Sequence, residues 1–311
     1  MCGSPRAYNF SFATRTVAIM SRTHVALPVA ALIVNAAVWG MSWWPFRELQ
    51  SQGLHPLWST ALIYFFSLAC IVVWRPGAWR SFGQHPQLWL LALAAGLTNV
   101  GFNWAVTVGD VVRVVLLFYL MPAWSVLLAW AVLGEKPTRA SLLRLLLAMA
   151  GVLIVLKAPG SPWPVPQGIA DWLALMGGLS FAATNVMLRN LDYTPSASRM
   201  LAMFGGGGVL ASAAALLGLA GGIVTAPVWT TTWLPVALGL GLAFLVSNMA
   251  LQYGAARLAA STTALVMLTE ILFASLSAAA LGAAEFSPRT LLGGSLIVLA
   301  ALLAAVAPAK R

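Results

Sequence analysis

Charged side chains are scarce in this sequence. Only 8% of its 311 residues are charged and seven are acidic, while 61% are hydrophobic. About a quarter of the residues of a soluble domain are charged. A chain with so few charges cannot cover a soluble surface of this size, so we expect its solvent to be a lipid bilayer.

Cysteine and histidine are also rare. The two cysteines, Cys2 and Cys70, are not at metal-ligand or redox spacing. The three histidines fall at or outside the ends of apolar stretches, and neither an HExxH nor a GxSxG string occurs. We therefore expect no metal site, no cofactor and no enzymatic activity.

In place of charge, the sequence contains ten apolar stretches. They lie near 25–45, 56–74, 88–107, 112–133, 140–156, 170–189, 198–219, 233–253, 259–282 and 289–308. A hydrocarbon core about 30 Å thick needs roughly 20 apolar residues in helical form. Backbone groups at that depth must be bonded within the helix. The pattern predicts an all-α integral membrane protein with ten transmembrane helices.

The basic residues are distributed unevenly between the connecting segments. The net charge is +10, but Lys and Arg are scattered singly at helix ends, which does not favour a nucleic-acid partner. If the N-terminus is cytoplasmic, most of the 17 Lys and Arg residues fall on the cytoplasmic side. We therefore expect a multi-pass protein of a bacterial-type cytoplasmic (inner) membrane with both termini inside.

The longest break between apolar stretches divides the chain into two halves. Residues 157–168, KAPGSPWPVPQG, contain four prolines, which disfavour helix at and before their own positions. We therefore expect a first repeat of five helices over 25–157 and a second over 168–308. Residues 1–22 are polar and aperiodic, and we expect them to be a disordered cytoplasmic N-terminus.

The two halves resemble each other locally. The segment 118–134, FYLMPAWSVLLAWAVLG, aligns without gaps with 266–282, VMLTEILFASLSAAALG. An odd number of helices per half forces the second half to be inverted in the membrane. Inverted repeats are typical of secondary transporters, whose substrate site lies near the midplane between the halves.

Four segments are distinctive: AAVWGMSWWPFR (36–47), LLFYLMPAWSVLLAWAVLGEKPT (116–138), LSFAATNVMLR (179–189) and ALVMLTEILFASLSAAALG (264–282). With them the chain resembles, over about 25–308, the ten-helix EamA-type permeases of the drug/metabolite transporter superfamily. The resemblance implies transport of small metabolites or drugs, often export, through a cavity between the repeats. One departure is LGAAEFS, where the family usually has an uninterrupted LGE turn.

Glu270 is the first candidate for a functional residue because it lies inside the ninth apolar stretch. A charge at the bilayer centre costs about 2.5–3.5 kcal/mol on insertion scales, so such a residue usually faces a cavity or a partner. Two interpretations are equally open. Glu270 is either a proton-coupling or substrate-binding carboxylate, or a protonated group hydrogen-bonded to neighbouring helices.

Amides and aromatic side chains supply the other candidates for substrate binding. They are Asn99, Asn103, Asn185, Asn248, Trp39, Trp43 and Tyr119. Amides offer donors and acceptors to polar substrates, and aromatic rings stack on planar or cationic ligands. The alternatives are interhelical hydrogen bonds for the amides and an interfacial belt for Trp43. Pro122 should kink the fourth helix, either as a gating hinge or as a structural bend.

These features together favour a secondary transporter. We expect it to move a small metabolite, an amino acid or a similar polar or aromatic compound, by alternating access and as an exporter. The alternatives are proton-coupled efflux of hydrophobic cationic drugs through Glu270, or a facilitative uniporter. The expected partners are the substrate, the lipid bilayer and, in the proton-coupled case, protons. Both a monomer and a homodimer are compatible with the sequence.

Overall fold

The computed structural model describes the backbone of residues 10–109, 111–157, 160, 166–228, 230–282 and 287–306. The described residues are 82% helical and contain no strand. Ten helical segments in these ranges are long and apolar enough to cross a membrane. The predicted all-α membrane fold with ten transmembrane helices is therefore confirmed.

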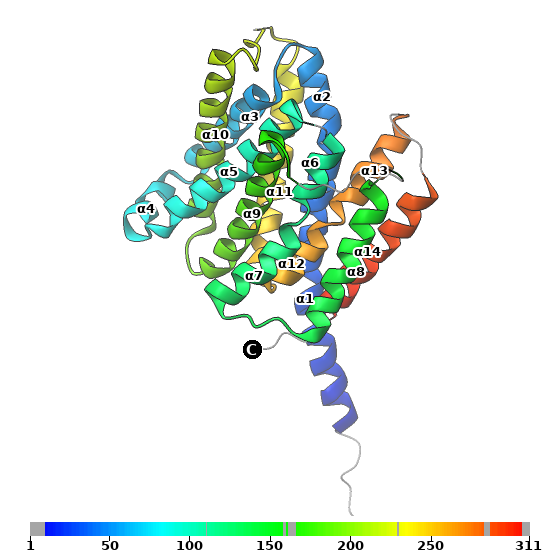
Figure 1. The fold of residues 1–311 in the computed structure, drawn as a ribbon. Coiled ribbons are helices and arrows are strands. Elements are labelled where there is room, and N and C mark those ends of the chain that lie inside the picture. The colour runs from blue at the N-terminus through cyan, green and yellow to red at the C-terminus, as the bar shows by residue number, and fades with distance from the viewer. Residues whose placement is uncertain are drawn as a thin grey trace, which may run out of the picture.

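Fourteen α-helices and one short 3-10 helix make up the described fold, which Figure 1 shows. The first half contains α1 (Phe10–Met41), α2 (Trp43–Ser51), α3 (Pro56–Trp74), η1 (Pro76–Trp79), α4 (Arg80–Gln84), α5 (Gln87–Val108), α6 (Val111–Phe118), α7 (Met121–Leu133) and α8 (Arg139–Leu156). The second half contains α9 (Ile169–Asn190), α10 (Ser196–Ala220), α11 (Leu234–Ala255), α12 (Ala260–Met267), α13 (Glu270–Ala280) and α14 (Pro288–Ala305).

The first helix is longer than the sequence led us to expect. We predicted disorder over 1–22, but α1 begins at Phe10 and projects from the bundle (Figure 1). No proline or glycine occurs between Phe10 and Val25, so a helix nucleated within the membrane can extend through this segment. Residues 1–9 lie outside the described residues, and for them the prediction stays a prediction.

Two of the spans are each broken into two helices. The fourth span breaks between α6 and α7, and the ninth breaks between α12 and α13. In the ungapped alignment of 118–134 with 266–282, the two breaks fall within one residue of each other. Figure 1 shows α6 above α7 but α12 below α13. The two broken spans therefore run in opposite directions, as an inverted repeat requires.

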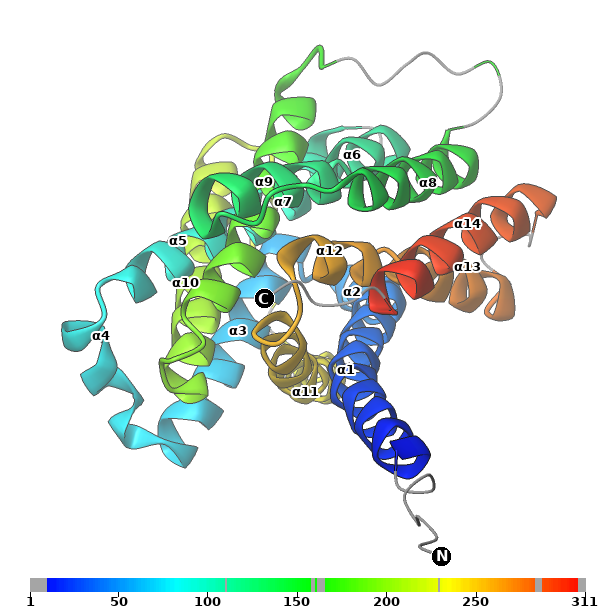
Figure 2. The same cartoon turned by 90° about the horizontal axis from the view of Figure 1, so that it is seen from below.

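Packing between helices follows the same symmetry. In the first half α5 packs along α9, and its counterpart in the second half, α11, packs along α1. Likewise α7 packs beside α9, and α13 packs beside α1. The pair α3 and α10 and the pair α8 and α14 each join equivalent helices of the two halves. The view from below places α10 and α14 on opposite sides of the bundle (Figure 2).

Glycines allow the closest of these contacts. A Cβ atom added to Gly206 of α10 would lie 2.0 Å from the carbonyl oxygen of Ala92 in α5, and one added to Gly207 would lie 2.2 Å from the ring of Tyr64 in α3. No side chain fits at either position. The glycine run 205–208 therefore brings α10 against α3 and α5, as small residues commonly do between membrane helices.

Candidate functional site

A cavity of about 90 Å³ lies between the two halves. Helices from both halves line it, including the broken spans at α6, α12 and α13. A single water needs roughly 10–15 Å³ on this scale, so the cavity has room for several waters or a small ligand. It is the natural place to look for a binding site in a protein built from two repeats.

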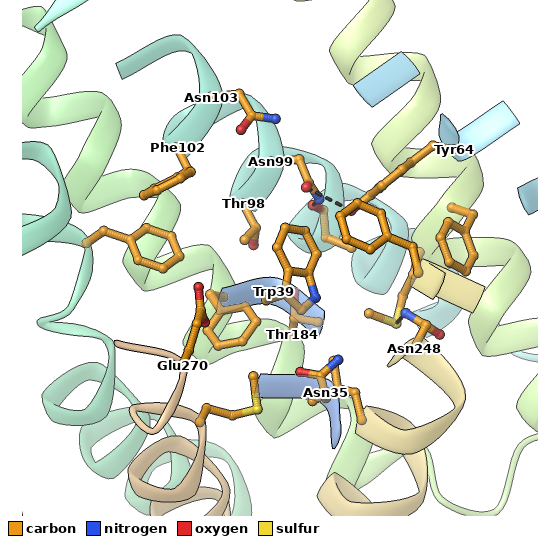
Figure 3. Close-up of a pocket in the computed structure, with 18 of the residues that line it drawn as sticks. Asn35, Trp39, Tyr64, Thr98, Asn99, Phe102, Asn103, Thr184, Asn248 and Glu270 are labelled. Atoms are coloured by element: carbon orange, nitrogen blue, oxygen red, sulfur yellow. Dashed lines mark hydrogen bonds between the residues drawn. The ribbon is translucent and has the colours of Figure 1, made fainter. Parts of the chain in front are cut away.

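Most of the residues predicted for the substrate site line this cavity. They are Trp39, Asn99, Asn103, Tyr119, Asn248 and Glu270. Figure 3 shows how the labelled members of this set surround Trp39. They come from five different spans that lie far apart in the sequence, so the tertiary structure brings them together.

Three predicted residues do not line the cavity. Trp43 donates from its Nε1 to the Ser277 hydroxyl at 2.9 Å and so ties α2 to α13. Pro122 is buried at the start of α7, directly after the break in the fourth span. Asn185 is buried beside Thr184, and it is Thr184 that faces the cavity.

Asn185 lies on the face of α9 that meets the fourth span. It is on the same helical stripe as Gly178, which packs against the Phe118 carbonyl, and Arg189, which lies 3.9 Å from the Glu135 carboxylate. Its amide atoms are buried and have no hydrogen-bond partner in the described chain. Asn185 therefore lies between helices, apart from the cavity.

Glu270 is the first residue of α13, directly after the break in the ninth span. The helix dipole favours negative charge at this N-terminus, although the amides of Ile271 and Leu272 already donate to the carbonyl oxygens of Leu268 and Thr269. Among the described residues, no basic side chain lies within salt-bridge distance of its carboxyl group. The hydroxyl of Tyr119 lies within hydrogen-bonding reach instead. The two breaks therefore place a phenol and a carboxyl group together in the cavity wall.

The aromatic residues form stacking surfaces in the cavity. Trp39 stacks on Phe244 with ring centroids 4.5 Å apart and planes inclined by 20°. Tyr64 meets the edges of Phe204 and Phe244 at 5.1 and 6.2 Å. Such surfaces suit a planar or apolar ligand group.

The amides of α5 are already bonded within the protein. The Tyr64 hydroxyl donates to Asn99 Oδ1 at 2.8 Å, and Asn99 Nδ2 donates to the Ala95 carbonyl at 2.8 Å. Asn103 Nδ2 donates to the Thr60 hydroxyl at 2.7 Å. A ligand that uses these two amides must therefore share or displace existing bonds.

Sequence reasoning missed Asn35, which also lines the cavity. Its Nδ2 donates to the Ser247 hydroxyl at 2.6 Å and to the Ser247 carbonyl at 2.9 Å, while its Oδ1 is buried without a partner in the described chain. A signal was available, because Asn35 precedes Trp39 by one helical turn on the same face.

Other lining residues carried no distinguishing signal. They are Tyr64, Ala95, Thr98, Phe102, Phe118, Phe181, Thr184, Met203, Phe204, Phe244, Leu251 and Met267. Apolar side chains on a membrane helix face lipid, protein and cavity alike, so the residue type does not indicate the face.

Comparison with known proteins confirms the resemblance seen in the sequence. Residues 26–157 match the EamA-like transporter family, and this range covers the first predicted repeat. "Protein RarD" of Streptomyces exfoliatus is 27% identical over 165 residues, which cover 50% of this chain and 49% of that protein. "Uncharacterized transporter PA0485" of Pseudomonas aeruginosa is 30% identical over 160 residues, which cover 50% of this chain and 43% of that protein. The matched region spans about half the length of these relatives.

A solved crystal structure shares the fold. It superimposes with a TM-score of 0.72 at 18% sequence identity, covering 89% of this chain and 96% of that one. At this identity the similarity establishes the fold alone. The superposition covers residues of both halves of the chain, whereas the family match covers only residues 26–157.

Proposed function

We propose that this multi-pass membrane protein, whose first half matches the EamA-like transporter family, is a secondary transporter of a small metabolite. The cavity between the two halves is its substrate site, and transport proceeds by alternating access. We further propose that it lies in a bacterial-type inner membrane with both termini in the cytoplasm.

The membrane placement rests on the uneven distribution of the basic residues, most of which fall in the segments assigned to the cytoplasm.

The composition of the cavity is the main support for the proposed transport of a small metabolite. Its wall combines the carboxyl group of Glu270, the amide of Asn248 and the stacked rings of Trp39 and Phe244. This combination suits a molecule with polar ends and an apolar or aromatic body. An amino acid or a similar compound fits that description, and the direction we propose is export.

Glu270 also supports a second mechanism, proton coupling. Among the described residues it has no basic partner, and ionisable groups of this kind inside membrane proteins commonly serve as proton relays. Proton-coupled efflux of a hydrophobic cation would use the same carboxyl group to bind the drug. A facilitative uniporter would need no titrating group at all.

Ligand-induced thermal stabilisation of the purified protein tests the substrate class. The panel contains amino acids, amines, nucleosides, sugars and cationic dyes, because any ligand that binds only the folded state raises the melting temperature. We expect amino acids to stabilise the protein, and Glu270→Gln to weaken the effect. Glu48→Gln makes the same chemical change outside the cavity and serves as the matched control.

Flux measurements in proteoliposomes separate the mechanisms. A proton-coupled exporter should lose its pH-gradient-driven flux in Glu270→Gln, whereas a uniporter should retain flux driven by the substrate gradient. Stabilisation by a compound that is never transported would contradict the proposed transport function. Undiminished binding and flux in Glu270→Gln would contradict the role assigned to the carboxyl group.

A further inference from the structure

A chain of hydrogen bonds connects the cavity to a buried arginine outside it. Arg199, in the first turn of α10, donates from Nε to Gln252 Oε1 at 3.1 Å. Gln252 Nε2 donates to Asn248 Oδ1 at 2.7 Å, and Asn248 lines the cavity. All three side chains are buried. The chain therefore runs through protein and not through solvent.

The direction of this chain is fixed by the chemistry of its first member. A guanidinium group has donors and no acceptor, so Gln252 must present its oxygen to Arg199 and its nitrogen to Asn248. The oxygen of Asn248 is thereby occupied. Its Nδ2 remains, 3.4 Å from the sulfur of Met203, which also lines the cavity. A thioether is a weak acceptor, so a stronger ligand acceptor would replace it.

The charge of Arg199 is only partly offset. Its Nη1 donates to the carbonyl oxygens of Leu191 and Thr194, which closes the C-terminal end of α9. Within the described ranges no carboxylate lies within 4.0 Å of the guanidinium group, although Asp192 attracts it from farther away. Charge is weakly screened in a low-dielectric interior, so this end of the cavity is electropositive.

The opposite end of the cavity presents a hydrogen-bond acceptor. Figure 3 shows Glu270 and Asn248 on opposite sides of Trp39. Glu270 supplies a carboxyl group there, and an ionised carboxylate accepts hydrogen bonds. The cavity therefore has a donor end at Asn248 and an acceptor end at Glu270.

We propose that Arg199 is a positioning residue that, through Gln252, holds Asn248 as a hydrogen-bond donor, and that the cavity accordingly binds a zwitterion in one orientation. The ligand carboxylate lies at Asn248, its ammonium group lies at Glu270, and its body lies along Trp39. This inference rests on the proposed transport function and specifies its substrate class.

The variant Gln252→Glu reverses the chain and provides the test. An ionised carboxylate only accepts hydrogen bonds, so Glu at this position would accept from both Arg199 and Asn248. Asn248 would then turn its oxygen toward the cavity. The probes are L-phenylalanine and L-leucine, each paired with its carboxamide, because the members of a pair differ only in the group that should meet Asn248.

We expect the wild-type protein to prefer the carboxylate of each pair and Gln252→Glu to shift the ratio of dissociation constants by about tenfold or more toward the carboxamide. That is the size expected for one charge-assisted hydrogen bond. Gln252→Leu interrupts the chain without reversing it, so it should weaken carboxylate binding with no gain for the carboxamide. Gln84→Glu adds the same charge at an exposed position and should leave the ratio unchanged.

An unchanged ratio in Gln252→Glu would overturn the inference and leave the transport function intact. If only sugars, nucleosides or dyes bind and are transported, the inference of a zwitterionic substrate likewise fails and the transport function stands. If no compound binds or is transported, the inference and the proposed function both fail. If Gln252→Glu does not fold, Arg199→Leu is measured instead, because it removes the donor that orients Gln252. Loss of the carboxylate preference in a stably folded Arg199→Leu supports the inference, whereas retention overturns it.

Discussion

The hydroxyl of Tyr119 faces the carboxyl group of Glu270, and each residue lies at the break of a different broken span. Tyr119 follows α6 in the first half, and Glu270 begins α13 in the second. Any motion of one half relative to the other must change this contact. It is therefore a direct physical link between the two repeats and the cavity.

Tyr119 and Glu270 should be energetically coupled. We expect Tyr119→Phe and Glu270→Gln to be non-additive in a double-mutant cycle on thermal stability, with a coupling energy of about 0.5–3 kcal/mol. The matched cycle pairs Glu270→Gln with Tyr64→Phe, whose hydroxyl bonds Asn99 instead. Equal coupling in the two cycles would argue against a specific contact between Tyr119 and Glu270.

Gly40 should tolerate no side chain. A Cβ atom there would lie 2.5 Å from the Glu270 carbonyl oxygen and 2.7 Å from Phe273 Cβ, and neither atom can move away by a rotamer change. We expect Gly40→Ala to separate α1 from α13, lower the melting temperature and reduce transport. In Gly239→Ala the new Cβ meets nothing within 4 Å, so this control should be neutral or slightly stabilising. Similar behaviour of the two variants in a thermal melt would contradict the close packing.

The ion pair between Arg113 and Asp171 should contribute more stability than the pair between Arg189 and Glu135. Arg113 Nη2 lies 2.9 Å from Asp171 Oδ2, and Nε makes two further bonds to the same carboxylate. The second pair is 3.9 Å apart and more exposed. Breaking a buried pair costs about 3–5 kcal/mol, and an exposed pair contributes about 0–1 kcal/mol, so the part-buried pair of Arg113 and Asp171 should fall between these two ranges.

Thermal melts of Asp171→Asn and Glu135→Gln compare the two pairs with the same chemical change. We expect a clearly larger loss in Asp171→Asn, which also weakens the bond that the carboxylate accepts from the Gln167 amide at 2.8 Å. A larger loss of melting temperature in Glu135→Gln would contradict the expectation that the pair of Arg113 and Asp171 contributes more stability.

His55 should make the N-terminus of α3 sensitive to pH. Its Nδ1 accepts from the Leu57 amide at 3.2 Å, which requires a neutral ring, and burial lowers the pKa of His55 below its usual 6.5. Because the folded-state pKa is the lower one, this contribution to stability is complete above pH 6.5. It is lost as the pH falls through the folded-state pKa.

The comparison with His55→Asn isolates this effect, because Asn is a good N-cap that does not titrate. We expect the melting temperature of the wild-type protein to fall relative to that of His55→Asn between pH 7.5 and pH 5, by the equivalent of about 1 kcal/mol. Parallel curves for the two proteins over this range would rule out the titrating cap.

The sequence alone determined the membrane fold, because the length and composition of each apolar stretch are set directly by the thickness of the bilayer. It also identified Glu270, since an acidic residue inside such a stretch is costly wherever it faces. The alignment of 118–134 with 266–282 identified the broken spans as equivalent segments. Gly134 and Gly282 end these segments with the same left-handed φ of 68°.

Only the tertiary structure decided which side chains face the cavity. Thr184 lines it and its neighbour Asn185 does not, because successive residues point about 100° apart around a helix. The structure also decided the break at Leu268 and Thr269, where no proline interrupts the chain. In a bilayer the lipid-facing and protein-facing sides of a helix are both apolar, so the sequence has no polarity pattern that assigns a face, and packing between helices makes that choice.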